Sequence, residues 1–564
     1  MDNQRIFVWA TLGLVLWLNY ITWQRDYAPP PLPVAQQPTP ANANSPQVDR
    51  STETLPQLPS DTKDPSSLPA AAHTETTPAA AHDAVATIHV VTDVLDLDIS
   101  TRGGDLLRAD LLKYPKVKNE PAPVRLFNTG SPGLFVARSG LRVADKRAEP
   151  THMAIFQSGA TEYRLNAGDA QLEVPLTWTD GQGVTVTKTY IFHPGSYRID
   201  LKYDVDNKSL TDWKGASYVQ LVRHYEQLKR SYFNVETYAY RGPAIYDGKK
   251  YRRLQVEDKD DSHYTGSASG GWIAAMQHHF VAAAVPPTNA SYDYQLNVDA
   301  DNDFILSYRG PLATVNAGGT HTFNETLFVG PKLQSQLAIA GPKLELTADY
   351  GRYLSVIAQP LFWLLGKVHS FVGNWGVAII IVTFLIKLAF YKLTAASGRS
   401  MAKMRNLSPR IKAIQERYKD DREQLGRQMM DIYKKEKINP LAGCLPILIQ
   451  IPFFLAFYWV LLESVEMRQA PFFGWITDIS ARDPFFILPV LMGAAMFMQY
   501  KLQPMPTTDP MQAKIFQFMP LIMAGTMAAF PAGLVLYWFT NTLLSIAQQW
   551  RINKLVAAEG KKAT

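Results

Sequence analysis

The sequence predicts a multidomain membrane protein in which an α-helical bundle of six transmembrane spans is joined to a large external all-β domain. Two observations lead to this fold class. The chain of 564 residues is long enough for several domains, and its apolar (47%) and charged (19%) residues are unevenly divided. Long apolar runs dominate residues 375–547, whereas polar and apolar residues are interspersed through residues 27–348. A purely soluble protein and a purely membrane-embedded one are both excluded.

Residues 1–24 are predicted to form a transmembrane anchor. The apolar run Ile6–Trp23 is flanked by arginines, as expected for a segment that ends at both membrane surfaces. A cleavable signal peptide is the alternative, but no small-x-small cleavage site follows the run. Because Tyr20 and Trp23 are bulky interfacial residues, we expect the anchor to be retained.

The external region divides into a tether and a folded domain. Residues 25–86 are rich in proline, alanine, threonine and serine, so they cannot bury a core and predict an extended, flexible tether. Residues 87–348 predict an antiparallel β-sandwich, because apolar and charged residues alternate at period two in Tyr197–Val205. Val184–Phe192 and His321–Val329 are two further predicted strands.

The β domain shows no catalytic or metal-binding pattern. Its histidines lack a zinc-binding spacing, and His278 and His279, taken as neighbours on a strand, should point to opposite faces. Gly242–Lys249 has five residues between its glycines, where a phosphate-binding loop has four. Ser267–Gly271 is expected to be a flexible loop.

The single cysteine, Cys444, lies in the membrane region and is expected to be a small buried hydrophobic residue rather than a reactive thiol. We therefore predict no catalytic residue, no metal site and no cofactor.

The membrane region begins with residues 349–373, which predict an interfacial amphipathic helix because Leu354–Val372 is only partly apolar. Residues 374–550 follow as the predicted membrane core. Its five spans are expected at Trp375–Tyr391, Cys444–Leu462, Pro484–Tyr500, Ile515–Phe530 and Leu534–Ala547. Pro531 and Gly533 predict a tight hairpin between the last two spans.

The distribution of lysine and arginine predicts the orientation of these spans. Basic residues are concentrated between the second and third spans, and such an excess marks the cytoplasmic side of a membrane. With six spans, both chain termini then lie in the cytoplasm, with a basic tail at residues 551–564, and the β domain lies on the outer side.

Residues 397–438, between the second and third spans, predict two amphipathic helices packed as an antiparallel hairpin. Apolar residues recur every three or four positions in Met401–Tyr418 and again in Leu425–Ile432, and Asp420 and Asp421 lie in the turn. The basic face has two compatible interpretations: contact with anionic lipids, or docking of an acidic partner such as ribosomal RNA or a targeting factor. The predicted docking residues are Lys403, Arg405, Arg410, Lys412, Arg417 and Lys419.

Lys387 is the most informative position in the membrane core. It follows Trp375 by about 18 Å along a helix that rises ~1.5 Å per residue, which leaves it inside a hydrocarbon layer ~30 Å thick. Snorkelling of the lysine to the cytoplasmic interface is one interpretation. Thr383, one helical turn earlier, and Gln450, in the next span, favour a hydrated cavity open to the cytoplasm instead. The spans contain no carboxylate to pair with Lys387, which argues against a proton-relay pump.

Six motifs across the membrane region carry a family resemblance. They are Met401–Arg405, Asn439–Cys444, Gln450–Pro452, Arg468–Phe472, Thr508–Gln512 and Phe530–Tyr537. The chain resembles the bacterial YidC membrane protein insertase family, in its Gram-negative form with a large periplasmic domain. The resemblance implies a five-span insertase core behind the N-terminal anchor, a hydrophilic groove closed toward the periplasm, and a periplasmic domain similar to the sugar-mutarotase supersandwich.

The resemblance also implies which residues line the groove. Lys387 matches a groove cation that is usually arginine in the family, and Thr383 and Trp538 match its threonine and its aromatic residue, with Tyr537 adjacent. Lysine keeps the charge but lacks the planar five-donor fork of arginine. Together with Gln450, these residues form the predicted substrate groove.

The function implied is that of an insertase and chaperone of the bacterial inner membrane, without covalent chemistry and therefore not an enzyme. The expected partners are nascent membrane proteins, the Sec translocon, the ribosome and targeting factors at the cytoplasmic face, and anionic lipids. Two other classes stay open. A transporter would need paired ionisable residues and an internal repeat, and a membrane-anchored sugar-binding protein would need a catalytic constellation in the β domain.

Overall fold

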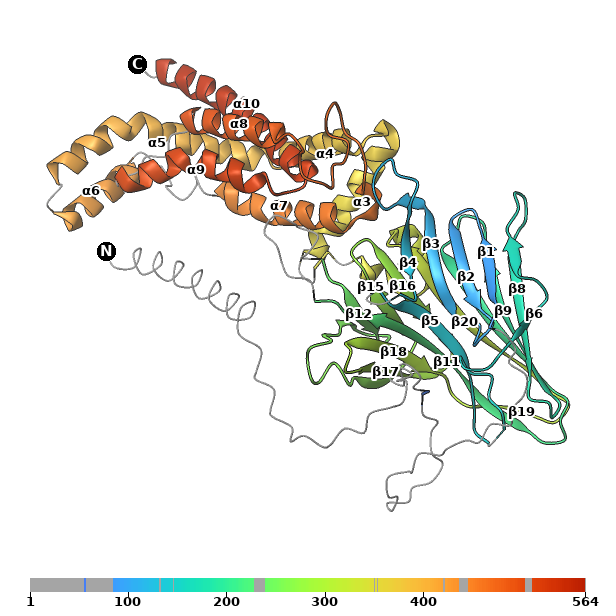
Figure 1. Ribbon diagram of the computed structural model, residues 1–564. Helices are drawn as coiled ribbons and strands as arrows, with labels where there is room; N and C mark the ends of the chain where they lie inside the picture. The colour runs from blue at the N-terminus through green and yellow to red at the C-terminus, as the bar shows by residue number, and fades with distance from the viewer. Residues whose placement is uncertain are drawn as a thin grey trace, which may run out of the picture.

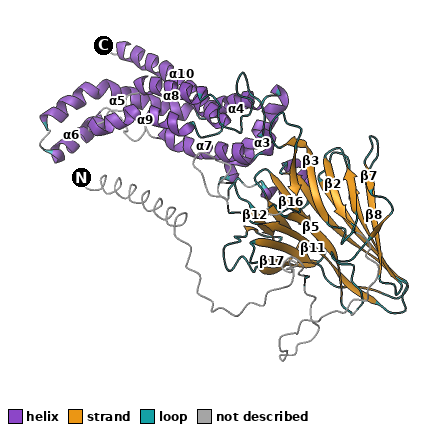
Figure 2. Ribbon diagram, viewed as in Figure 1, coloured by secondary structure: helices purple, strands orange, loops and turns teal. Residues whose placement is uncertain are grey.

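The computed structural model joins a β-rich part to a helical part (Figures 1 and 2). It describes residues 55–56, 85–130, 133–145, 147–227, 239–348, 350–351, 354–418, 421–435, 445–502 and 510–562. The predicted anchor at residues 1–24, most of the tether and Cys444 lie outside these ranges.

The β-rich part is a sandwich of two sheets. In order across the 11-stranded sheet lie β14 (Thr265–Ser269), β17 (Ser291–Val298), β18 (Asp303–Arg309), β11 (Trp213–His224), β5 (Phe135–Val143), β3 (Leu106–Pro115), β2 (Leu95–Ser100), β1 (Thr87–Val91) and β7 (Glu162–Arg164), with β19 (Ala313–Val315) beside β11 and β4 (Pro123–Phe127) beside β3. The 9-stranded sheet runs β13 (Tyr251–Arg253), β12 (Gly242–Tyr246), β15 (Trp272–Met276), β16 (Phe280–Val285), β20 (Thr320–Pro331), β10 (Arg198–Asn207), β9 (Val184–Phe192), β8 (Leu172–Thr179) and β6 (Gln157–Ser158). One apolar core, with side chains from both sheets, fills the space between them.

The three strands predicted from the sequence are confirmed and are neighbours. Strand β10 pairs in antiparallel fashion with β9 on one side and β20 on the other. Along β10 the buried Ile199, Leu201 and Tyr203 alternate with partly exposed polar residues, because successive strand side chains point to opposite faces. The expectation of a flexible loop at residues 267–271 is wrong for Ser267–Ser269, which belong to β14 and pair with β17 at the edge of the sheet.

A lysine is buried in the core of the sandwich. The Lys188 ammonium donates to the carbonyls of Gly103 (2.7 Å), Gly104 (3.0 Å) and Ser139 (3.2 Å). Burial lowers the pKa of Lys188 and raises the pKa of the neighbouring Asp105 carboxyl. The alternation of strand β9 directs Lys188 into the core, in phase with Val186 and Tyr190, and the three carbonyls take the place of water around its ammonium group.

The helical part contains the elements between β20 and the end of the described chain. Two short elements, α2 (Gln334–Ala340) and the 3₁₀ helix η2 (Leu344–Thr347), connect it to the sandwich. The long helices are α3 (Ser355–Val372), α4 (Trp375–Ala389), α5 (Tyr391–Arg417), α6 (Arg422–Lys435), α7 (Leu445–Glu463), α8 (Ile487–Leu502), α9 (Pro510–Met527) and α10 (Ala532–Lys562), with the 3₁₀ helix η4 (Val465–Met467) after α7. Helix α10 packs against α4, α5, α7 and α8, and α8 also packs against α9. Helix α10 thus occupies the centre of the arrangement.

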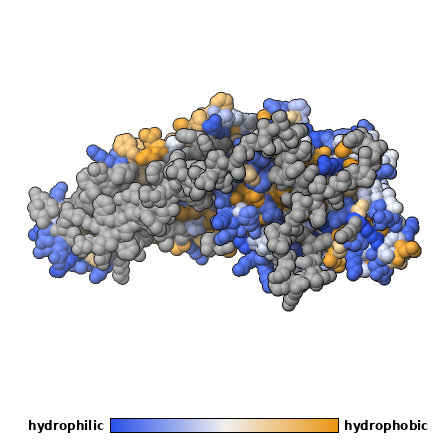
Figure 3. Space-filling model, turned by 60° about the horizontal axis from the view of Figure 1, so that its bottom comes forward, coloured by the Kyte–Doolittle hydropathy of each residue, from blue (hydrophilic) through white to orange (hydrophobic). Residues whose placement is uncertain are grey.

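Helix lengths and hydropathy identify one combination with the character of a membrane span. In the described part of the chain no individual helix meets the length and hydropathy expected of a span. Helix α4 and Tyr391–Ser400 of α5 meet them together, with a bend of 66° between them. The bend falls at Phe390, which links the two helices. Exposed apolar side chains are frequent on α8 and α9, among them Val490 (66% exposed) and Leu521 (71%). On the face shown in Figure 3, hydrophobic residues gather over the middle of the helical part, whereas the sandwich is mainly hydrophilic.

Helices α5 and α6 pack against each other at the end of the helical part that lies away from the sandwich (Figure 1). The contact joins Met404, Leu407 and Ile411 of α5 to Met429, Ile432 and Tyr433 of α6. Asp421 caps α6, since its carboxylate accepts from the backbone N–H groups of Glu423 (3.1 Å) and Gln424 (3.0 Å). Helix α5 begins at Tyr391, ahead of the predicted start of the hairpin at residue 397, because no helix-breaking residue follows Phe390.

The segment after α7 is held by the β-sandwich. His278 Nε2 donates to the carbonyl of Leu462 (2.6 Å), and Val465 is packed into the core of the sandwich. Lys332, at the end of β20, forms an ion pair with Glu463 (3.7 Å), and the two side chains are only 1% and 3% exposed. The sandwich and the helical part are therefore joined by a buried interface that contains a hydrogen bond, an ion pair and apolar packing.

The expectation that His278 and His279 point to opposite faces is wrong. They lie in the turn between β15 and β16, where the alternation of a strand does not apply, and their rings stack with centroids 3.8 Å apart. Burial lowers the pKa of His278 to about 3, so the ring is neutral at physiological pH. A neutral ring with one N–H bonded to Leu462 suits this buried contact.

Breaking the buried Lys332–Glu463 pair should destabilise the protein more than breaking an exposed pair. Glu463→Ala removes the carboxylate that faces a buried ammonium group, so we expect the free energy of unfolding to fall by about 3–5 kcal/mol. Thermal unfolding of the purified protein measures this change. The matched control is Glu423→Ala, which breaks the exposed Arg427–Glu423 pair and should cost less than about 0.5 kcal/mol. Equal losses in the two variants would contradict the assignment.

Candidate functional site

A polar cavity lies where α4, α7 and α10 meet. Its volume is about 40 Å³. Its lining consists of Thr383, Ile386, Lys387, Phe390, Thr394, Gln450, Phe453, Tyr537 and Asn541. Four of the five residues predicted for the groove, Lys387, Thr383, Gln450 and Tyr537, are therefore brought together from three separate helices. A cavity of this size with several polar groups on its wall has room for water.

Lys387 lies in the last turn of α4, where the helix dipole favours a positive charge. Its ammonium group donates to the hydroxyl of Ser545 on α10 (2.8 Å), and that hydroxyl donates to the carbonyl of Asn541 (2.7 Å). Among the described residues, no carboxylate lies within ion-pair distance of Lys387. A neutral hydroxyl is thus the partner that satisfies this cation, and the charge itself stays uncompensated.

Thr383 and Tyr537 are two buried residues of the cavity wall. The Thr383 side chain is 1% exposed, and its hydroxyl donates to the carbonyl of Ile379 on the same helix (2.6 Å). Its lone pairs remain available to the cavity. The Tyr537 ring is 2% exposed and stacks on Phe457, with centroids 4.3 Å apart. Burial and these contacts therefore set the position of both side chains on the cavity wall.

Trp538 does not line the cavity. Its ring packs edge-on against Phe454 of α7, with centroids 4.6 Å apart. Because consecutive helical residues are about 100° apart around the axis, Tyr537 and Trp538 cannot both face the same cavity. Trp538 is therefore the one predicted groove residue that is not on the wall of this cavity, and its place in the groove stays a prediction.

Sequence reasoning missed the polar stripe of α10. Tyr537, Asn541 and Ser545 are spaced four residues apart and so lie on one face of the helix. The stripe continues at Gln548, whose side-chain amide donates to the hydroxyl of Thr394 on α5 (2.8 Å). The four-residue spacing of polar residues in an otherwise apolar run is the signal that identifies them.

The end of the helical part nearest the sandwich is closed by packing. Gly376 of α4 lies against the ring of Phe472, where a Cβ atom would come within 2.0 Å of a ring carbon. Asn374, which caps α4, donates to the carbonyl of Phe472 (2.8 Å). Lys387 lies about 18 Å further along α4, at ~1.5 Å per residue. The polar cavity is therefore at the end of α4 that leads to α5, and the opposite end is packed against Phe472.

Comparison with known proteins places both parts of the chain in one family. The family model described as "60Kd inner membrane protein" matches residues 367–559, and the model described as "YidC periplasmic domain" matches residues 87–364. Proteins named "Membrane protein insertase YidC" from Methylococcus capsulatus and Thioalkalivibrio sulfidiphilus are 45% and 46% identical to this chain over the whole of both sequences. The protein of that name from Pseudomonas aeruginosa is 42% identical, also over both full lengths.

The chain belongs to the YidC membrane protein insertase family. The resemblance seen in the sequence motifs is thereby confirmed. As a YidC protein it resides in the inner membrane and carries a periplasmic domain, which is the β-sandwich. The cavity lies in the part matched by the inner membrane protein model, and it is built by helices rather than by the sandwich.

The predicted docking residues of this YidC protein lie on and after α5. Lys403, Arg405, Arg410, Lys412 and Arg417 belong to the helix, while Lys419 lies outside the described residues. Of those whose side chains the structure describes, Arg410 and Arg417 are exposed. Both are on the hairpin, and neither lines the cavity.

The Lys387–Ser545 hydrogen bond should contribute to the stability of this YidC protein. Ser545→Ala removes the acceptor of a charged donor, so we expect the free energy of unfolding to fall by about 1.5–3 kcal/mol. In a Lys387→Met background the same change should cost less than about 0.5 kcal/mol, because the donor is already absent. Unfolding of the purified protein from detergent micelles by added SDS measures both values.

A second variant serves as the control for this cycle. Thr526→Ala removes an exposed hydroxyl that donates only to the carbonyl of Ile522 on its own helix. It should cost less than about 0.5 kcal/mol in either background. If Ser545→Ala costs the same with and without Lys387, the hydrogen bond contributes no stability.

Proposed function

We propose that this protein inserts nascent inner-membrane proteins by receiving the polar flank of an incoming segment in the cavity between α4, α7 and α10. The single observation that carries the proposal is Lys387, a cation held among apolar helices with a serine hydroxyl as its partner. The protein acts alone or together with the Sec translocon, and it forms no covalent bond to its client.

The physical problem that an insertase solves is the cost of moving polar groups through hydrocarbon. Each unsatisfied backbone group costs several kcal/mol there, and a charge costs more. Lys387, Gln450 and Asn541 offer donors and acceptors part of the way across. Because Lys387 lacks a carboxylate partner among the described residues, an acidic flank would gain a charge-assisted hydrogen bond there.

The path of the client follows from the two ends of α4. The cavity reaches α5 at Thr394, and α5 leads to the hairpin that the positive-inside rule assigns to the cytoplasm, whereas the packed end adjoins the periplasmic sandwich. We infer that the client enters from the cytoplasmic side and stops at the layer around Phe472. Exposed apolar residues of α8 and α9, such as Val490 and Leu521, then provide a surface along which its apolar part reaches lipid.

The basic hairpin is the proposed docking surface. Arg410 and Arg417 are exposed on α5, at the far end of the protein from the sandwich. Such a surface attracts the phosphates of ribosomal RNA, an acidic targeting factor or anionic lipid headgroups. Docking at the hairpin would bring the exit of a ribosome close to the cavity, and it needs no contact with the cavity itself.

Replacing Lys387 should affect clients according to the charge of their translocated flank. Lys387→Arg keeps the positive charge and should leave insertion nearly unchanged. Lys387→Met should lower insertion of a client with an acidic flank about tenfold, which corresponds to ~1.4 kcal/mol, and should change a client with an amide-bearing flank much less. Proteoliposomes containing the purified protein, with protease protection of the translocated flank, provide the measurement.

The matched control for Lys387 is another lysine at the end of a neighbouring helix. Lys501→Met removes an exposed cation of α8 that lies outside the cavity. It should leave both clients unaffected. An equal effect of Lys387→Met on the two clients would exclude the electrostatic role of Lys387.

Charge reversal on the hairpin should separate docking from insertion. The double variant Arg410→Glu, Arg417→Glu should weaken binding of ribosomes to the purified protein at least tenfold at 50 mM salt, and the wild-type affinity should itself fall as salt is raised to 200 mM. Insertion of a client released from the ribosome should change less than twofold, because the cavity is intact. A variant that binds ribosomes as tightly as the wild type would refute the docking role.

A further inference from the structure

A second and larger cavity lies in the periplasmic β-sandwich, apart from the insertase helices. Its volume is about 300 Å³, a size that accommodates a small molecule. Strands of both sheets form it: β4, β5, β11 and β18 from the 11-stranded sheet, and β12 with the turn after β15 from the other. Its lining is Arg125, Leu126, Asn128, Gly133, Leu134, Phe135, Arg223, His224, Tyr225, Glu226, Arg241, Gly242, Gln277 and Phe304.

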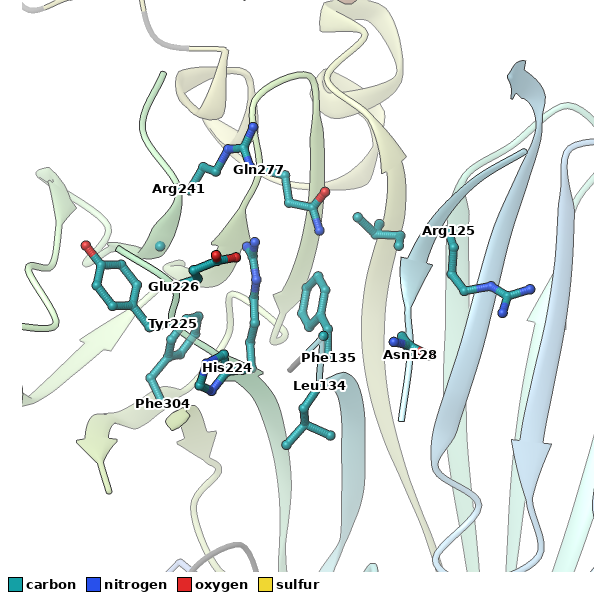
Figure 4. Close-up of a pocket in the computed structure, with 14 residues that line it drawn as sticks. Arg125, Asn128, Leu134, Phe135, His224, Tyr225, Glu226, Arg241, Gln277 and Phe304 are labelled. Carbon is teal, nitrogen blue, oxygen red and sulfur yellow. The ribbon is translucent and has the colours of Figure 1, made fainter. Parts of the chain in front are cut away.

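The three arginines of this cavity differ in their partners. Arg125 is fully engaged, since its guanidinium donates to both carboxylate oxygens of Asp110 (2.8 and 2.9 Å) and turns away from the cavity (Figure 4). Arg223 donates to the carbonyl of Met276 (2.7 Å) and lies over the ring of Phe135. The Arg241 Nε atom is buried and has no hydrogen-bond partner in the described part of the chain.

Arg223 and Arg241 thus present two positive charges to one cavity. In the ranges that the structure describes, neither forms an ion pair with a carboxylate. Their proximity has a physical consequence: burial, together with the charge of Arg241, lowers the pKa of Arg223 to about 10. Two desolvated guanidinium groups near each other repel, and a bound anion would offset this repulsion by pairing with both.

The other residues of the cavity wall indicate which chemical groups the ligand carries besides its anionic group. Gln277 and Asn128 add side-chain amides, and Glu226 adds an exposed carboxylate (Figure 4). These groups suit hydroxyls, which both donate and accept hydrogen bonds. The imidazole of His224 is oriented by the Asp303 carboxylate (2.7 Å), so it also presents a fixed edge. Phe135 and Phe304 supply apolar surface.

We propose that this cavity binds a phosphate ester of a polyol, with Arg223 and Arg241 on the phosphate and the amides and Glu226 on the hydroxyls. A phosphate has oxygens enough for both guanidinium groups, which a single carboxylate shares less readily. Phosphate monoesters of glycerol and the glycerol phosphate headgroup of a phospholipid have this same chemistry.

The position of the cavity relates it to the membrane region. Gln277 precedes His278, whose ring donates to Leu462 at the end of α7. One wall of the cavity therefore lies beside the contact with the helical part, and a lipid headgroup and a soluble ester are the two sources of ligand that the test distinguishes.

The test uses the full-length protein in nanodiscs of phosphatidylcholine and two probes. The soluble probe is sn-glycerol 1-phosphate, titrated by isothermal calorimetry. The lipid probe is phosphatidylglycerol, added to the nanodiscs and assessed as the increase in the melting temperature of the sandwich. Saturable binding of the first probe identifies a soluble ester as ligand, and an effect of the second alone identifies a headgroup; either result supports the proposal if the variants below abolish it.

The variants contrast arginines on the same wall. Arg241→Gln and Arg223→Gln should each weaken the response at least tenfold, whereas Arg125→Gln, which alters an arginine already paired with Asp110, should change it less than twofold. Arg223→Lys retains the charge in case Arg223→Gln unfolds the domain, and it should keep part of the binding. Absence of a response to both probes, or a response that Arg241→Gln leaves intact, would overturn the proposal.

Discussion

A charge that is removed from water needs a partner, and this constraint organises the whole protein. Lys387 lies among the apolar helices. Its ammonium group has a hydrogen-bond partner because Ser545 of α10 lies next to it. That contact requires α4 and α10 to be neighbours, although more than 150 residues separate the two side chains in the chain. The central place of α10, in contact with α4, α5, α7 and α8, follows from the same requirement together with apolar packing.

The buried cations of the protein satisfy the constraint in different ways. Lys188, in the core of the sandwich, uses three backbone carbonyls, and Lys332 uses the Glu463 carboxylate across the contact between the two parts. Lys387 has a hydroxyl, which satisfies a hydrogen bond but leaves the charge. Structural lysines are thus fully compensated, whereas the lysine in the insertase cavity and the arginine pair of the periplasmic cavity keep a positive potential. These are the places where an anionic group gains most.

The contact between the sandwich and the end of α7 joins the two parts mechanically. Val465 belongs to the core of the sandwich, and the residues around it belong to the segment between α7 and α8. The same segment reaches Phe472, which covers Gly376 and closes the periplasmic end of the helical part. The sandwich therefore supports the packed segment around Phe472, even though it contributes no residue to the cavity wall.

The sequence by itself determined the division into a β domain and a helical membrane region, the positions of three strands and the family. These follow from local pattern, because period-two alternation in Tyr197–Val205 and long apolar runs are properties of consecutive residues. Thr383, Lys387 and Gln450 were also identifiable, since a polar residue in an apolar run stands out wherever the helix lies. The tertiary structure decided the partners. That Ser545 meets Lys387, that Trp538 turns away from the cavity, and that His278 and His279 stack in a turn all depend on how distant elements are rotated and paired. Rotation of a helix and the position of a turn arise from packing between segments far apart in the chain, and no local pattern encodes them.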